Sequence, residues 1–233
     1  MVFESGILLN VEEADREYNL IELDETVPSV EDSILMLLSV LPESPIVSRT
    51  LMMKEVFLFY ADFLKKFSIN SDPVNDAGYF AYKYGPYSFR VNISLASLAL
   101  SGKIRISDFG DYLEEQRRKM KGYEELEISS GREKYRACFS TSIDFDTVFA
   151  PYAEPFKRHE IEMKKFKDEL ANFKWTWDQK TAGGTLLYIY STPSFRKFIE
   201  KSELKDKFPE AYGGRVKEDY APRNNPFFGD GQA

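Results

Sequence analysis

The chain has 233 residues, 43% of them hydrophobic and 15% aromatic, with a formal net charge of −7 at pH 7. That length suffices for one well-cored domain of ordinary size and a smaller one beside it. One cysteine excludes an intrachain disulfide, which fits a reducing compartment, and with a single histidine it cannot supply the about four ligands of a structural zinc site. No basic segment precedes an apolar one at the start, and no apolar run approaches the about 20 residues of a membrane span, so we expect a cytoplasmic protein without a membrane segment.

The negative charge is concentrated at the start of the chain. Residues 1–47 hold 11 acidic residues and one basic residue, a local charge of −10, whereas the remainder carries +3. One interpretation is a solvated, poorly ordered leader, as acidic blocks often are. The other is an acidic arm that covers a basic patch on the body or binds a basic partner. We expect the body to fold without residues 1–28.

The aromatic side chains, 19 phenylalanines and 14 tyrosines, admit two interpretations. Large apolar side chains are usually buried, which predicts an aromatic-rich core. Tyrosine and phenylalanine are also favoured at interfaces, which predicts an adhesive surface.

Serine residues mark the starts of three expected helices. Ser29 is followed three residues later by Asp32 and begins a helix that ends at Pro42, and Ser48 begins a long amphipathic helix to about Phe67. Ser88 begins a third helix to about residue 100, where Gly102 suits the position just past its end. Between the second and third helices, residues 79–87 predict an extended arm, because a proline biases the residue before it away from helix.

Alternating patterns predict strands after the third helix. Residues 103–107 form one, and residues 124–129 and 135–142 form a hairpin around a Ser-Gly-Arg turn, with a charged helical insertion at 111–121 before it. Three helices followed by a β-hairpin with a long tip are the order of a winged helix.

The second half predicts further helices, at residues 155–173, 181–190 and 194–208, and a flexible tail. The fold class is therefore α+β, a winged-helix-like domain of three helices plus a β-hairpin wing followed by a helical C-terminal region. We divide the chain into an acidic arm (1–28), the winged-helix-like domain (29–150), the helical region (151–208) and the tail (209–233).

Two stretches carry a resemblance to a known family. The helix from Ser48 to Phe59 and the segment Tyr82-Lys-Tyr-Gly-Pro-Tyr-Ser-Phe-Arg90, followed by Leu98-Ala-Leu-Ser-Gly-Lys-Ile104, resemble the Panacea (SocA-type antitoxin-associated) and YwgA-like winged-helix family. Residues 186–206 resemble the helical end of YwgA-like chains more faintly. The resemblance covers residues 30–107 and 181–207. It implies a winged-helix-like fold used for protein interaction, in several cases to neutralise a toxin, and it brings no catalytic residues.

Catalytic motifs are missing from the sequence. The only possible thiol–imidazole pair is Cys138, in a strand-like run, with His159, in a charged helical run; nucleophilic catalysis also needs a group that orients the base, and none is evident. There is neither a phosphate-binding loop nor a nucleophile elbow. A hydrolase that uses two carboxylates is left without support rather than excluded. We therefore expect no enzyme, no cofactor, and no catalytic or metal site.

The third helix offers little for reading DNA. Its two apolar stripes predict that most of its circumference is buried, which leaves Arg90 as the one long polar side chain able to reach a base. Basic residues elsewhere are better placed for phosphate contact, or else form a solvated face balanced by neighbouring glutamates. These basic residues are Lys103 and Arg105 beside the strand at 103–107, Arg117, Arg118, Lys119 and Lys121 in the insertion, and Arg132, Lys134 and Arg136 on the wing.

The first hypothesis is a protein-binding module of Panacea or antitoxin-like type. Its interface uses the extended arm, above all Tyr84, Gly85, Pro86 and Tyr87, together with aromatic residues of the second half. The alternative is a winged-helix transcription regulator that contacts DNA mainly through backbone phosphates. A protein partner is expected first, and DNA second.

Overall fold

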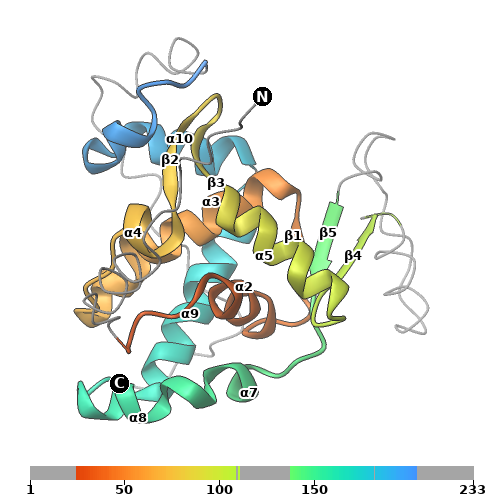
Figure 1. The fold of residues 1–233 in the computed structure, drawn as a ribbon, viewed down its shortest axis with the longest axis vertical. Coiled ribbons are helices and arrows are strands. Elements are labelled where there is room, and N and C mark those ends of the chain that lie inside the picture. The colour runs from red at the N-terminus through yellow and green to blue at the C-terminus, as the bar shows by residue number, and fades with distance from the viewer. Residues whose placement is uncertain (1–24, 109, 111–136, 181, 204–233) are drawn as a thin grey trace, which may run out of the picture.

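A computed structural model describes residues 25–108, 110, 137–180 and 182–203, which form a mixed α+β fold dominated by helices (Figure 1). The α-helices are α2 (Val30–Ser39), α3 (Arg49–Leu58), α4 (Pro73–Ala77), α5 (Phe89–Leu100), α7 (Phe145–Phe149), α8 (Ala153–Arg158), α9 (Met163–Asp178) and α10 (Ala182–Ser191). The strands are β1 (Ile46–Val47), β2 (Tyr79–Tyr82), β3 (Gly85–Ser88), β4 (Arg105–Asp108) and β5 (Ala137–Ser140). Shorter turns are the π-helix η1 (Phe59–Phe63) and the 3-10 helices η2 (Leu64–Phe67), η4 (Ala150–Tyr152) and η5 (Pro193–Phe198).

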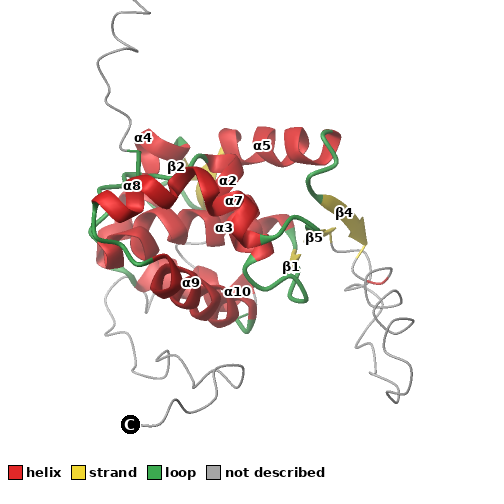
Figure 2. Cartoon of the chain, turned by 90° about the horizontal axis from the view of Figure 1, so that it is seen from below, coloured by secondary structure: helices red, strands yellow, loops and turns green. Residues whose placement is uncertain are grey.

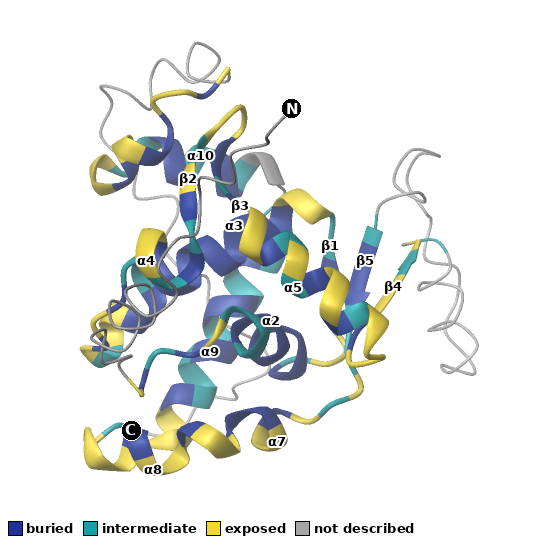
Figure 3. Cartoon of the chain, viewed as in Figure 1, coloured by how far each residue is buried: buried dark blue, intermediate teal, exposed yellow. Residues whose placement is uncertain are grey.

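Helix α2 lies at the centre of the helical part. Ser29 caps it as expected, because its side chain accepts a hydrogen bond from the Asp32 backbone N–H over 3.1 Å. The helix ends at Ser39, before Pro42. It contacts α3, α5, α7 and α9, which explains why all seven residues from 33 to 39 are buried (Figure 3).

Helix α3 begins where Ser48 caps it, with the Leu51 N–H donating to Ser48 Oγ over 3.1 Å. The helical path continues through η1 and η2 to Phe67, as expected. The expectation that this helix is amphipathic was wrong, because α2, α10, β1 and β3 cover it on several sides and residues 51–58 are all buried. Even its charged side chains, Lys54 and Glu55, are inside the molecule.

A three-stranded antiparallel sheet, in the order β1–β5–β4, lies at one side of the helices (Figure 2). Ile46 pairs with Phe139, and Ile106 pairs with the same residue from the other side. The expected strand at 103–107 corresponds to β4, and that at 135–142 to β5. The expected strand at 124–129 and the insertion at 111–121 lie outside the described residues.

The expected extended arm is a β-hairpin. Strands β2 and β3 are antiparallel, with Phe80 opposite Tyr87 and Tyr82 opposite Gly85. Ser88 then caps α5 through the Val91 N–H over 3.2 Å, as expected. The helix ends in a Schellman motif around left-handed Gly102, in which Lys103 N–H donates to the Leu98 carbonyl.

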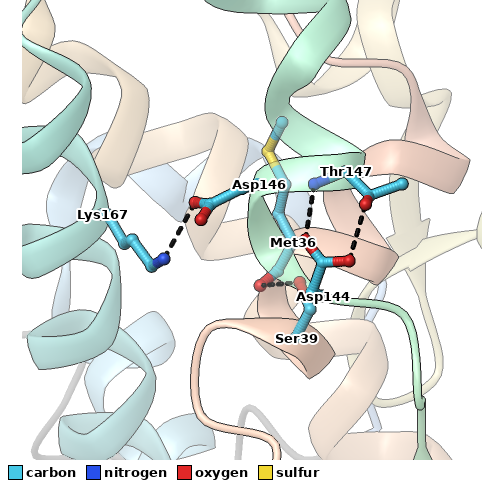
Figure 4. Close-up of polar contacts among 6 residues, drawn as sticks. All are labelled: Met36, Ser39, Asp144, Asp146, Thr147 and Lys167. Carbon is cyan, nitrogen blue, oxygen red and sulfur yellow. Dashed lines mark hydrogen bonds and ion pairs between the residues drawn. The ribbon is translucent and has the colours of Figure 1, made fainter.

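The helix expected over 155–173 is two helices, α8 and α9. A second Schellman motif ends α8: Glu160 is left-handed at φ 58°, and the Ile161 N–H donates to the Phe156 carbonyl over 2.8 Å. Ile161 then packs against the core, which redirects the chain into α9. Farther on, Lys167 of α9 forms an ion pair with Asp146 of α7, whose helix is capped by Asp144 through Thr147 (Figure 4).

The helix expected over 181–190 corresponds to α10. The expectation of a helix over 194–208 was wrong for its described part. Residues 193–198 form the 3-10 helix η5, and turns follow to residue 203. Contacts to the hairpin explain the bend: Ser202 Oγ and the Glu203 N–H both donate to the Lys83 carbonyl.

One hydrophobic core joins the two halves of the chain. The Phe57 ring of α3 meets Tyr79 of β2 and both Phe195 and Phe198 of η5, with ring centres 4.9–5.2 Å apart. The aromatic-rich core predicted from composition is therefore present. Among the described residues, no helix combines the length and apolar content that crossing a bilayer requires.

Candidate functional site

A set of large apolar side chains is exposed on the β2–β3 hairpin and α5. We call it the hairpin–α5 face. Ile93 is 68% exposed and Leu100 is 91% exposed, although both belong to a helix that is otherwise packed on α2. Figure 3 shows α5 with buried and exposed stretches alternating along its length. The face consists of Phe80, Tyr82, Tyr84, Phe89, Ile93 and Leu100.

Aromatic rings order the hairpin end of this face. Phe80 stacks on Phe89, with ring centres 5.5 Å apart, so the first turn of α5 is fixed against β2. The Tyr87 ring contacts both Phe89 and Tyr82, with ring centres 5.3 Å and 5.0 Å apart respectively. Such a cluster gives a rigid apolar surface that loses little side-chain entropy when a partner covers it.

The expectation that most of α5 is buried was wrong. Val91, Leu95 and Leu98 are buried against the core, but the second apolar stripe faces outward because no described element covers it. Arg90 is exposed at the start of the helix, where its guanidinium donates to the Asn75 carbonyl over 3.2 Å. Its stem lies against Gly78. This hydrogen bond to α4 restricts the Arg90 side chain.

A cavity of about 300 Å³ opens between the hairpin and the first two turns of α3. The α3 side carries the longer cationic side chains, and the hairpin side carries tyrosine rings. Its lining consists of Arg49, Thr50, Met53, Lys54, Tyr82, Tyr84, Gly85, Tyr87 and Asn92.

Lys54 is the most unusual residue in this lining. Its side chain is buried, and the ammonium donates to the Pro86 carbonyl over 2.5 Å. Burial lowers the pKa of Lys54 from 10.5 to about 7, because the charged form loses its hydration. Gly85, at φ 86°, has a backbone angle that favours glycine, and a Cβ there would lie 3.7 Å from Lys54 Nζ, an ordinary contact.

A second set of buried polar side chains lies on another side of α3. Lys174 donates to Asp178 and, over 2.8 Å, to the Ser44 carbonyl, and Ser44 Oγ also donates to Asp178 over 2.7 Å. Glu55 is fully buried beside this pair, and neither of its carboxyl oxygens has a hydrogen-bond partner among the described residues. Burial, and then the nearby Asp178 carboxylate, raise the pKa of Glu55 well above 4.5. We take Glu55 to be neutral and the group to be structural.

The cysteine and the histidine do not form a site. Cys138 is buried in the central strand β5, whereas His159 is exposed at the end of α8, on another side of the molecule (Figure 1). Burial raises the pKa of the Cys138 thiol to about 11, which keeps it protonated and unreactive. Within the described ranges, no three acidic, cysteine or histidine side chains are placed to hold a metal ion.

Apart from Arg90, the predicted interaction residues fall into two groups. Tyr84, Gly85 and Tyr87 line the cavity, and Pro86, next to them in β3, is buried. Arg117, Arg118, Lys119, Arg132 and Lys134 lie outside the described residues.

Sequence reasoning missed Lys54 and Arg49, because lysine and arginine near the start of a helix normally face solvent. Of the aromatic residues expected at the interface from the second half, Phe173 and Trp177 are buried and Trp175 is half-buried. They therefore belong to the core more than to a surface.

No family model, no curated protein and no solved structure matches the chain.

Proposed function

We propose that this chain is a non-catalytic macromolecule-binding protein, a protein-interaction module of Panacea or antitoxin-like type, and that the hairpin–α5 face holds its partner. The order of elements supports a winged-helix-like arrangement, since the helices α2, α3 and α5 precede the antiparallel strands β4 and β5. Fold alone does not determine function. The proposal therefore depends on the exposed face.

The observation that carries it is the exposure of Phe89 and Ile93, 60% and 68%, beside an ordered ring cluster. Contiguous exposed apolar surface is uncommon on proteins that bind nothing. Burying one large apolar side chain contributes about 1.5–3 kcal/mol, so placing a charge at one of them should weaken binding measurably.

The same face disfavours DNA as the partner of α5. A helix in the major groove needs long polar side chains toward the bases, whereas this one presents Phe89, Ile93 and Leu100. Arg90 is already bonded to the Asn75 carbonyl.

Affinity capture from native cells tests the proposal with matched variants. Ile93→Asp places a charge in the face, and Met163→Asp places one at a 46% exposed apolar residue on α9. We expect wild type and Met163→Asp to capture the same protein, and Ile93→Asp to capture at least about tenfold less, since tenfold corresponds to about 1.4 kcal/mol. Unchanged melting of both variants completes the control.

Two results would overturn the proposal. One is equal capture by wild type and Ile93→Asp. The other is tight binding to random duplex DNA that falls steeply with salt, with no protein captured, which would move the DNA-binding regulator to first place.

A further inference from the structure

The cavity between α3 and the hairpin has an unbalanced charge. Two of the nine residues that line it, Arg49 and Lys54, are cationic, and none is acidic. Neither cation forms an ion pair with any residue in the described part of the chain. The cavity therefore favours a ligand with negative charge.

The Lys54 ammonium has fewer hydrogen-bond acceptors within the described residues than it has hydrogens to donate. An ammonium has three hydrogens to donate, and one of them goes to the Pro86 carbonyl. A buried charge without a counter-ion is costly, and an opposite charge brought within reach removes much of that cost. The first turn of α3 lies at the same cavity through Arg49 and Thr50, and its backbone N–H groups and dipole also favour an anion.

The remaining walls are mostly apolar, with Thr50 and Asn92 as their polar residues. Tyr82, Tyr84, Tyr87 and Met53 line the same space. At about 300 Å³ the cavity is at the lower end of the range for ligand sites, so it fits one residue or a small molecule. Its occupant must combine a negative charge with an apolar body.

The last residue of a polypeptide joins both features at one carbon atom. Its α-carboxylate and its side chain leave the same Cα, whereas an internal Asp or Glu carries its charge on a chain that must enter and leave again. We propose that the cavity binds the C-terminal residue of the partner protein, an aromatic or large aliphatic one, with Lys54 and Arg49 on its carboxylate and the tyrosine rings around its side chain. This inference rests on the proposed function and specifies the partner's chemistry.

N-acetyl-phenylalanine and its C-terminal amide are the probes, since they differ only in the charged group. Binding is followed by NMR of methionine methyl groups, with Met53 as the reporter inside the cavity. We expect the acid to shift the Met53 signal and to bind at least about tenfold more tightly than the amide, because charge-assisted hydrogen bonds are the stronger ones. Equal binding of acid and amide, or no shift at Met53, overturns the proposal, and this comparison needs no variant.

Two variants assign the charge recognition. Lys54→Met should reduce the preference for the acid several-fold, with Arg49 left to hold the remainder, and Lys83→Met should keep it in full, because Lys83 lies in the same hairpin but outside the lining and pairs with Glu203 at 3.4 Å. If Lys54→Met does not fold, Lys54→Gln takes its place. A preference for the acid that is unchanged by loss of the Lys54 amine contradicts the assignment.

A third probe separates a chain end from a free small acid. The peptide Ser-Gly-Ser-Phe with a free carboxylate should bind at least as tightly as 3-phenylpropionate; much tighter binding of the small acid would make the ligand a metabolite and overturn the inference. The proposed function is tested separately, by partner capture with Ile93→Asp. If that variant loses the partner while no C-terminal probe binds, the function stands and this inference falls.

Discussion

The α-carbon of Gly85 faces the ring of Tyr190, and a Cβ added to it would lie 3.4 Å from Tyr190 Cε2. That separation is an ordinary contact, so Gly85→Ala is disfavoured by its φ of 86° more than by a clash. Gly102, at φ 70° with nothing within 4 Å, is the matched control. We expect both alanine variants to lose about 1–2 kcal/mol in urea unfolding.

Leucine variants at Gly85 and Gly102 separate the cost of the positive φ from the cost of contacts made by the new side chain. Gly85→Leu should lose clearly more stability than Gly102→Leu, because only the first side chain meets Tyr190 and Lys54. Equal losses for the two leucine variants would contradict this account of the hairpin.

Lys54 should make stability depend on pH. Its pKa is about 7 in the fold against 10.5 for an ordinary lysine, so between those values the unfolded chain binds more protons and stability rises with pH. Lys54→Met removes the cost of burying charge, which is fully present below pH 7. The variant's gain over wild type should therefore be about 2–3 kcal/mol larger at pH 6 than at pH 9.

Urea unfolding at both pH values measures that difference, and Lys83→Met is the control for removing an exposed amine. The variant also leaves the Pro86 carbonyl without its donor, which lowers stability by a similar amount at every pH. The difference between the two pH values is therefore the test, and parallel profiles for wild type and Lys54→Met would refute it.

Glu55 should act in the opposite sense. Its pKa is raised in the fold, so above pH 4.5 the folded chain keeps a proton that the unfolded chain releases, and stability falls as pH rises. Glu55→Gln is neutral at every pH, so its stability relative to wild type should increase as pH rises above 4.5, on top of any constant cost of burying the amide. Glu162→Gln changes an exposed carboxyl in the same way and serves as the control. A difference between Glu55→Gln and wild type that does not change with pH would contradict the raised pKa of Glu55.

The packed part of the chain begins before Ser29. Thr26 is 2% exposed, and the hydroxyl of the fully buried Tyr60 donates to the Pro28 carbonyl over 2.6 Å. A chain that starts at Ser29 should be about 1–3 kcal/mol less stable than one that starts at Glu25, since it strands a buried donor. Tyr60→Phe should destabilise the longer chain more than the shorter one, because both lose the bond from Ser33 Oγ but only the longer one also loses the bond to the Pro28 carbonyl. Equal losses in calorimetry would disprove the link.

Local signals in the sequence predicted local structure well. Ser29, Ser48 and Ser88 cap their helices, and Gly102 ends α5, because each acts through hydrogen bonds or a backbone angle within a few residues. The extended character of residues 79–87 follows in the same way from Pro86. The features that could be predicted, helix caps and turns, depend on residues close to one another along the chain.

Burial was harder to predict because it depends on elements far away in the sequence. Ile93 occupies an apolar stripe that no described element covers, and Lys54 lies in a helix that β3 and α10 enclose. The break between α8 and α9 was missed because Glu160 gives no sign of a left-handed angle, although Ile161 has a place in the core. The candidate site therefore emerged from the fold, except for its tyrosine-rich hairpin.

The central place of β5 in its sheet has a consequence for synthesis. β1 and β4 are not bonded to each other, and each pairs with β5, the last of the three to leave the ribosome. Until residue 140 has emerged, both strands present open edges, and unpaired edges invite wrong pairing. The nascent chain thus completes this sheet in one late step, and a pause in translation before β5 would prolong the interval in which it is open to aggregation or to a chaperone.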